Sequence, residues 1–451
     1  MSFLLVIDKT SSAPDYRQRL QGLLCPYHGS VEKRTFKNGA LYLSSGGSFH
    51  GSHALFPAGT TQSSITAWLR IDLGDEVLRI GNDPMGMYPL WFFETEACSY
   101  FTSELKALSV IDGFRYLFKA DEDVLAIKRR PRDFSFLEDV RNLATSAVTV
   151  DLRTREVTVA RAPYLEFDQK VSITPEAAMA KLRKELEASL ATSEGLPGPW
   201  GSMLSGGIDS SVATALLASR EKKFDVYTLG TPLGDEYADA QDLAAHLGLR
   251  ANRIFVSEDE APGLFETVVW QNEVFDGLTA EILAQLKGLV KVSGTSSRRL
   301  FTGYGSDLLF GGMLLHTEYM RAVGVTNEQE LIERTSWSGE FRPFFHLSSG
   351  VELYHLYWHR PLVQLALNLP TPLNFKGEVQ KILLRDLAVE AGWLKREHAF
   401  RAKIGMSNGT NFYTLLSRAL GLGDGYAYPA KTARAWEYLK RRLTELTGRA
   451  P

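Results

Sequence analysis

Short apolar segments separated by polar turns dominate the first third of the chain. Four of them are rich in β-branched and apolar residues and are bounded by Gly, Ser or Asp: residues 3–7, 40–43, 65–71 and 77–80. Segments of this kind are typical of strands in an antiparallel sheet. Residues 147–151 and 156–159 alternate apolar and polar positions around a four-residue turn, which predicts a further pair of strands.

The pattern changes after this pair of strands. A polar connection at 166–172 leads to Thr174-Pro175-Glu176, which is an N-cap residue followed by proline at the first helical position. From residue 200 onward, apolar strands alternate with helical segments, as in strand 224–230, helix 238–247 and strand 251–256. Strands separated by helices predict parallel βαβ units, which bind ligands at the carboxyl ends of their strands. We therefore expect two domains, residues 1–170 and 171–451.

The segment Ser205-Gly206-Gly207-Ile208-Asp209-Ser210 lies between a short apolar run and a helix predicted at 212–219. Paired glycines let backbone N–H groups approach a ligand closely, and the following helix adds its positive end, so an anion is expected there. Asp209 would repel a phosphate unless a divalent cation lay between them. The alternative is an ordinary glycine turn that closes a βα unit.

The pattern S-G-G-x-D-S resembles the pyrophosphate loop of the ATP pyrophosphatase superfamily. Members of this superfamily cleave ATP between its α- and β-phosphates and activate a substrate as an adenylate. The resemblance implies that ATP contacts Leu204, Ser205, Gly206, Gly207 and Ser210 on the loop, and Leu229 and Gly230 after the next strand. Leu204 and Leu229 would line the adenine pocket, although they are equally well explained as core residues.

A second glycine-containing segment, Gly303-Tyr304-Gly305-Ser306-Asp307, again follows a short apolar pair. The glycines give the backbone close access to a ligand and present the tyrosine at a loop tip. Asp307 can complete a Mg²⁺ site with Asp209, because hard cations prefer carboxylate oxygens. Its position before an apolar run also suits a helix N-cap, and both roles can hold.

Residues 302–312 and 272–282 resemble carbapenam synthetase and β-lactam synthetase, a family descended from an asparagine synthetase-like ancestor. These enzymes close a β-amino acid into a four-membered lactam. Asparagine synthetases place a glutamate where this chain has Tyr304, which argues against asparagine synthesis.

The same resemblance implies the roles of individual residues. Segments 337–341 and 401–405 carry Glu340 and Lys403, which with Tyr304 form the implied catalytic set. Tyr304, Gly305, Ser306 and Glu340 would contact the substrate. Gly303 and Lys381 would contact ATP, and Asp209 and Asp307 would bind Mg²⁺.

Residues 82–92 and 101–108 resemble segments of the class II glutamine amidotransferase domain, an Ntn-hydrolase-like αββα sandwich. Working members attack glutamine with an N-terminal cysteine, but this chain has Ser2 there and its first cysteine is Cys25. A serine hydroxyl would need strong activation to replace the thiol. We expect this domain to serve as a scaffold without glutaminase activity.

Composition narrows the class of protein further. A net charge of -3 offers no basic surface for nucleic acid or an anionic membrane. Two cysteines make no disulfide framework, and no segment is apolar for long enough to span a bilayer or to act as a signal peptide. We expect a cytoplasmic protein that acts on a small molecule and forms homo-oligomers.

The resemblance to the carbapenam and β-lactam synthetases implies an AMP-forming C–N ligase that uses ATP and Mg²⁺ to convert a β-amino acid into a β-lactam. The substrate would be 5-carboxymethylproline-like, or a linear β-amino acid as in clavam or tabtoxin-type pathways. One alternative is an amide-forming relative such as a lasso peptide cyclase. Another is a catalytically silent nucleotide-binding scaffold.

Overall fold

The computed structural model describes most of the chain. The described residues are 2–11, 13–24, 30–44, 48–50, 53–56, 68–83, 86–126, 134–144, 146–161, 171–194, 198–221, 223–293, 296–297, 299–312, 330, 332, 351–402 and 406–448. The predicted domain boundary near residue 170 lies next to residues 162–170, which are outside this set, and it stays a prediction.

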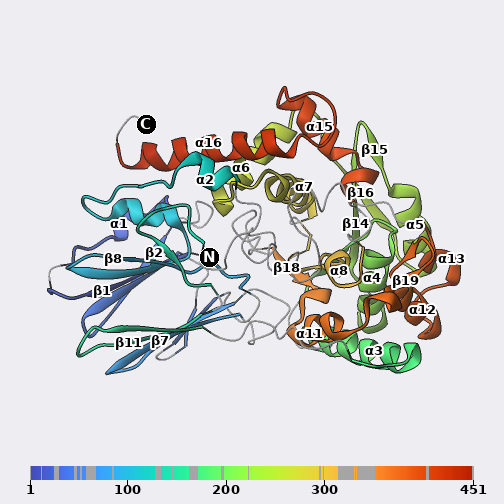
Figure 1. Ribbon diagram of the computed structural model, residues 1–451, viewed down its shortest axis with the longest axis horizontal. Coiled ribbons are helices and arrows are strands. Elements are labelled where there is room, and N and C mark those ends of the chain that lie inside the picture. The colour runs from blue at the N-terminus through green and yellow to red at the C-terminus, as the bar shows by residue number, and fades with distance from the viewer. Residues whose placement is uncertain are drawn as a thin grey trace.

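Two six-stranded antiparallel sheets form the N-terminal part of the molecule, at the blue and cyan end of Figure 1. The first has the order β10-β8-β9-β1-β3-β2. Its strands are β1 (Phe3–Asp8), β2 (Val31–Phe36), β3 (Gly39–Ser44), β8 (Trp91–Glu94), β9 (Cys98–Thr102) and β10 (Arg141–Asn142). The second has the order β12-β11-β7-β6-β5-β4. Its strands are β4 (Ser48–His50), β5 (His53–Phe56), β6 (Leu69–Leu73), β7 (Val77–Asn82), β11 (Ser146–Asp151) and β12 (Val157–Arg161).

Alternation of side chains along β1 explains how these sheets pack. Leu5 belongs to the core cluster between the sheets, together with Ile71 and Leu78 of the second sheet. Leu4 points to the opposite face, where it shares a cluster with Leu20 of α1 (Arg17–Leu20) and Leu108 of η1 (Leu105–Val110). The predicted strands at 3–7, 40–43, 77–80, 147–151 and 156–159 are therefore confirmed.

Helices cover one outer face of this pair of sheets among the described residues. Polar side chains such as Arg70, Asp72 and Arg79 alternate with buried residues along β6 and β7, so the outer face of the second sheet is partly exposed. The two central layers of the predicted αββα sandwich are present. Its second helical layer is not found among the described residues, and the Ntn-hydrolase-like assignment stays a prediction.

The C-terminal part is built on a mainly parallel sheet, as predicted. Its strands have the order β15-β14-β13-β17-β18, with β16 also paired to β14. All pairs are parallel except β14 with β15. The strands are β13 (Trp200–Met203), β14 (Asp225–Thr231), β15 (Gly234–Asp235), β16 (Ala251–Phe255), β17 (Arg299–Thr302) and β18 (Glu352–His355).

Helices surround this sheet (Figure 1). They are α3 (Pro175–Ala191), α4 (Ile208–Arg220), α5 (Tyr237–His246), α6 (Ala261–Asn272), α7 (Gly277–Ser293), α8 (Ser306–Leu309), η3 (Leu356–Trp358), α11 (Arg360–Asn368), η4 (Thr371–Asn374), α12 (Ile382–Glu390), α13 (Arg396–Ala399), α14 (Met406–Gly409), α15 (Phe412–Ala419) and α16 (Tyr428–Leu446). The predicted N-cap is confirmed, because the Thr174 hydroxyl accepts a bond from Ala177 N at 3.3 Å. A small hairpin, β19 (Phe375–Lys376) and β20 (Val379–Gln380), precedes α12.

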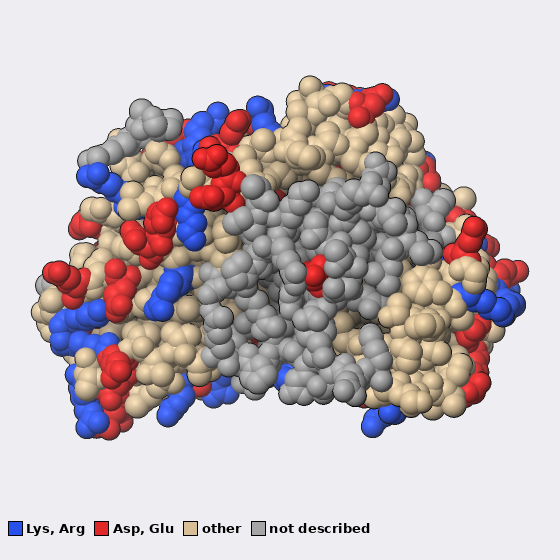
Figure 2. All heavy atoms as spheres, in the orientation of Figure 1, with Lys and Arg blue, Asp and Glu red and all other residues tan. Residues whose placement is uncertain are grey.

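Helix α16 connects the two parts of the molecule, as the red helix along the top of Figure 1 shows. Trp436 donates from Nε1 to Asp121 of α2 (Asp121–Ala126) at 2.8 Å, and its ring lies within 5.6 Å of the rings of Phe118 and Phe275. On the face shown in Figure 2, acidic and basic side chains are interspersed over the described surface. None of the helices in the described ranges has the length and apolar character that crossing a bilayer requires.

Candidate active site

The first glycine loop, residues 205–210, joins β13 to α4. Helix α4 begins at Ile208, four residues before the predicted start, so that Asp209 and Ser210 belong to its first turn. The Ser210 hydroxyl lies 3.0 Å from the Ser205 hydroxyl and accepts a bond from Ser205 N at 3.1 Å. Gly206 has φ +82°, and a Cβ there would lie 2.6 Å from Asp239 Cβ. Only glycine fits this position, because both its backbone conformation and the close approach of α5 exclude a side chain.

The second glycine loop, residues 303–307, joins β17 to α8 and lies directly against the first. A Cβ on Gly303 would lie 2.5 Å from Ser210 N. Ser306, which is fully buried, donates from its hydroxyl to Asp209 Oδ1 at 2.7 Å. The carboxyl ends of β13 and β17 thus bring the two loops together, as parallel neighbouring strands predict.

Asp209 and Asp307, one from each loop, form a cluster with Lys381. Lys381 Nζ lies 2.5 Å from both Oδ atoms of Asp209 and 2.5 Å from Asp307 Oδ1. Its side chain is fully buried, whereas those of Asp209 and Asp307 are 19% and 35% exposed. Burial lowers the pKa of Lys381, but the charges of Asp209 and Asp307 outweigh it and hold the pKa above its usual value.

The carboxylates of this cluster fit a divalent cation. Their oxygens converge on the Lys381 ammonium, and carboxylate oxygens are also the ligands that Mg²⁺ prefers, so an ion bound here would share these oxygens with Lys381. Among the residues that the structure describes, no group of three or more His, Cys, Asp or Glu side chains gathers as a metal site. Any ion held here would therefore take its remaining ligands from water or a bound phosphate.

Tyr304 is half-buried at the tip of the second loop. Its backbone N–H donates to the Thr302 hydroxyl at 3.3 Å, and that hydroxyl lies 2.9 Å from Nδ1 of His355. Burial lowers the pKa of His355 to about 3, so the imidazole is neutral at physiological pH. The Tyr304 and His355 ring centroids are 6.1 Å apart. Glu340, the predicted partner of Tyr304, lies outside the described residues.

Lys403 also lies outside the described residues, but the segment that leads to it is well anchored. Arg401 donates from Nη1 to the Asp239 carbonyl at 3.0 Å and pairs with Asp242 at 2.7 Å. His398 Nε2 lies 3.1 Å from the same Asp242 carboxylate. Because Asp239 also lies against Gly206, this segment ends beside the first glycine loop.

Leu204 and Leu229 are 2% and 4% exposed and belong to the hydrophobic core. Leu204 N donates to the Tyr227 carbonyl at 2.8 Å, which extends the pairing of β13 with β14. Gly230 lies close to β15, since a Cβ there would be 2.8 Å from Asp235 Cβ. The core explanation of the two leucines thus holds, and their contact with adenine stays a prediction.

Two residues near the site were missed by sequence reasoning. The Tyr357 hydroxyl donates to the Asp209 carbonyl at 3.1 Å, and burial followed by the charges of Asp209 and Asp307 raises the Tyr357 pKa. Arg385, four residues after Lys381, is 3% exposed and bonds only to backbone carbonyls among the contacts recorded for it. Tyr357 lies in an apolar run that gives no sign of a site, whereas the four-residue spacing of Lys381 and Arg385 was visible in the sequence.

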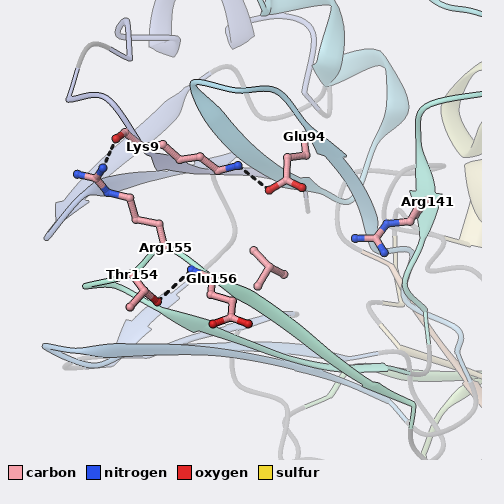
Figure 3. Close-up of a pocket in the computed structure, with 7 residues that line it drawn as sticks. Lys9, Glu94, Arg141, Thr154, Arg155 and Glu156 are labelled. Carbon is pink, nitrogen blue, oxygen red and sulfur yellow. Dashed lines mark hydrogen bonds and ion pairs between the residues drawn. The ribbon is translucent and has the colours of Figure 1, made fainter.

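A groove of about 480 Å³ at the edge of the N-terminal sheets is lined by Lys9, Glu94, Arg141, Thr154, Arg155, Glu156 and Val157. Figure 3 shows that its charged groups point in different directions. Lys9 pairs with Glu94 at 2.7 Å, Arg155 donates to the Lys9 carbonyl, and the Arg141 guanidinium lies 4.6 Å from the centre of the Phe92 ring. These groups do not converge on one ligand position, unlike those at the glycine loops.

Known proteins resemble this chain in sequence. Residues 181–342 match the family model of asparagine synthase. The carboxyethyl-arginine beta-lactam-synthase of Streptomyces clavuligerus is 29% identical over 255 residues, which cover 55% of this chain and 48% of that protein. The glutamine-hydrolyzing asparagine synthetase B of Escherichia coli is 23% identical over 384 residues, covering 77% of this chain and 61% of that protein. The chain thus spans about half to three fifths of the length of these relatives.

Among solved structures, the NMN synthetase of Francisella tularensis is 14% identical, over 62% of this chain and 98% of that one. Its TM-score of 0.27 is too low to bear on the fold. The sequence similarities carry the conclusion: residues 181–342, which include both glycine loops and the two aspartates, have the sequence pattern of the asparagine synthase family.

Proposed function

We propose that this protein is an ATP-dependent C–N ligase that closes a β-amino acid into a β-lactam and releases AMP and pyrophosphate. One observation carries the proposal. Asp209 and Asp307, one from each glycine loop, meet Lys381 at the carboxyl edge of a parallel sheet. An anionic substrate with a divalent cation suits this place, and the similarity to asparagine synthase supports ATP as that substrate.

In the first step, a carboxylate oxygen of the substrate attacks the α-phosphorus of ATP, and the bond to the bridging oxygen of the β-phosphate breaks. Backbone N–H groups of the first glycine loop and the Lys381 ammonium bind the phosphates. Asp209 and Asp307 would hold Mg²⁺, which supplies charge neutralisation and orients the leaving pyrophosphate. The products of this step are an acyl-adenylate and pyrophosphate.

In the second step, the amine of the same substrate attacks the activated acyl carbon, and the bond from that carbon to AMP breaks. The amine must first lose a proton, since an ammonium has no lone pair. Tyr304 would accept that proton as a general base, a role that typically contributes about 10²- to 10⁴-fold. We assign Glu340 to polarising Tyr304 and Lys403 to stabilising the oxyanion and the departing phosphate.

Two features favour a β-lactam over another amide. The chain has Tyr304 where asparagine synthetases place a glutamate. One of its relatives is named a carboxyethyl-arginine beta-lactam-synthase. We propose a 5-carboxymethylproline-like or linear β-amino acid as the substrate, and a cytoplasmic homo-oligomer as the working form.

The test is pyrophosphate release from ATP and Mg²⁺ across a panel of β-amino acids, with mass spectrometry of each product. Native protein and the Lys403→Ala variant are compared. Release coupled to a product lighter by one water, and lost in the variant, is the expected result. A product that joins two molecules would indicate a peptide ligase. ATP binding without pyrophosphate release from any member of the panel would favour the peptide cyclase or the scaffold.

A further inference from the structure

Arg385 lies in the interior beside the proposed site without touching Asp209, Asp307 or Lys381 through a recorded hydrogen bond. It occupies the first turn of α12, directly after Lys381, and is 3% exposed. A buried guanidinium must find hydrogen-bond acceptors, because its charge cannot be removed at any physiological pH. The acceptors of Arg385 therefore show which parts of the chain it serves.

All three recorded acceptors of Arg385 are backbone carbonyls, and they come from two separate segments. Nε donates to Gln380 O at 2.8 Å, and Nη1 donates to Ala399 O at 2.5 Å and to Arg401 O at 3.1 Å. Gln380 immediately precedes Lys381, and Arg401 closes the segment that α5 also anchors through Asp239 and Asp242. One side chain thus fastens the segment before Lys381 to the segment before residue 403.

The turn that Arg385 holds is an unusual one. Lys381 has φ +59°, in the left-handed region that non-glycine residues rarely adopt. Such a conformation persists only where its surroundings impose it. Gly312 packs against the Lys381 side chain, since a Cβ there would lie 2.6 Å from Lys381 Cε, and the Gln380 carbonyl is fixed by Arg385. Together these contacts aim Nζ between the two aspartates.

We propose that Arg385 is a positioning residue. It holds the Lys381 turn and the 399–401 segment in one arrangement, so that Lys381 Nζ stays at the carboxylate pair without any contact between Arg385 and the substrates. The catalytic part of this proposal rests on the proposed adenylation, whereas the tether itself does not. A purely structural residue would add stability to α12 and leave the two segments independent of each other.

The test compares Arg385→Met and Arg385→Lys with Leu387→Ala, a buried core change on the same helix. Hydrogen exchange followed by mass spectrometry needs no activity. Arg385→Met is expected to speed exchange of amides in 396–402 by about tenfold, because charge-assisted bonds to that segment are lost. Leu387→Ala should leave that segment protected. Equal exchange of 396–402 in the two variants would overturn the tether.

Pyrophosphate exchange kinetics then test the positioning role. Arg385→Met is expected to lower kcat about 10²-fold, the scale of a small misplacement of a catalytic group, while KM for ATP changes less. Arg385→Lys should recover part of kcat, since an ammonium can still reach one carbonyl. If Arg385→Met and Leu387→Ala lowered kcat by the same factor, the positioning role of Arg385 would be overturned. If native protein gives no pyrophosphate exchange, the proposed function fails, and hydrogen exchange alone decides the tether.

Discussion

Two lysines in this protein each lie between two carboxylates. Comparing the two clusters shows how a candidate ligand site differs from a purely structural ion pair. Lys381 pairs with Asp209 and Asp307 at the glycine loops. Lys106 pairs with Glu104 at 2.5 Å and with Glu273 at 3.3 Å, where the N-terminal sheets meet α6. Both ammonium groups are removed from water, so burial of the lysine does not distinguish the two.

The carboxylates distinguish them. Glu104 and Glu273 are only 3% and 2% exposed, and Glu273 also accepts bonds from the backbone N–H groups of Leu105 and Lys106 at 2.7 and 2.8 Å. The side chains of Asp209 and Asp307, on the two glycine loops, stay partly exposed. A ligand can reach the second pair but not the first. The Lys106 cluster thus joins the two parts of the molecule, and the Lys381 cluster is the one that we propose binds a substrate.

The largest expected effect is on stability, at the sealed cluster. Lys106→Met leaves two buried carboxylates without their cation, which should lower the free energy of unfolding by about 3–5 kcal/mol. Urea denaturation measures this loss. The double change Glu104→Gln with Lys106→Met should recover part of it, because one uncompensated charge is gone. Pyrophosphate release per folded molecule should stay the same, and a selective loss of activity would place Lys106 in the site after all.

The next largest effect is on activity, at the open cluster. Asp209→Asn should reduce pyrophosphate release by about 10²–10³-fold, because it removes a charge that pairs with Lys381 and that we propose to bind the cation. The measurement is steady-state release at saturating ATP. Asp225→Asn is the matched control, since Asp225 begins β14 at the opposite edge of the same sheet. Equal losses in the two variants would mean that the carboxyl edge has no special role.

Local patterns made much of the fold predictable, and they also predicted that the two glycine loops meet. The alternating burial along β6 and the Thr174 N-cap are determined by residues that are neighbours in the sequence. The approach of Asp209 to Asp307 follows because their loops leave neighbouring parallel strands. The Glu273 contacts join residues more than 160 positions apart, and the Arg385 contacts depend on how α12 packs against 399–401. No local pattern encodes such pairs, because they arise only once the elements have packed.

Glu236 offers a third case, a half-buried carboxylate to which no lysine is paired among the described residues. Burial, followed by the nearby charges of Asp239 and Asp235, raises the pKa of Glu236 to about 8. Between about pH 4.5 and 8 the folded state keeps a proton that the unfolded chain has released, so stability falls as pH rises through this range. Glu236→Gln should remove that dependence and gain stability over native protein towards pH 8.

Urea midpoints at pH 5, 6.5 and 8 check this prediction. Glu122→Gln, an exposed change on α2, is the control for altered net charge. Stability curves of Glu236→Gln and native protein that run parallel across this range would show that Glu236 is ionised in the folded state. In that case this protein would tolerate a charged, largely enclosed carboxylate without a lysine partner as well as one with a lysine partner.

The smallest expected effect is at the groove of Figure 3, where Lys9 pairs with Glu94 at the surface. The two side chains are 23% and 45% exposed, and an ion pair of this kind contributes about 0–1 kcal/mol because water screens it. Lys9→Met should therefore shift the free energy of unfolding by no more than about 1 kcal/mol, and less at high salt. Lys106→Met is the same substitution at a lysine whose carboxylate partners are buried. Comparing the urea midpoints of the two variants therefore measures how much burial of the ion pair adds to stability. A loss of unfolding free energy in Lys9→Met as large as that in Lys106→Met would mean that exposure of the carboxylate does not decide how much a lysine stabilises this protein. The distinction between the sealed and open clusters would then rest on the glycine loops alone.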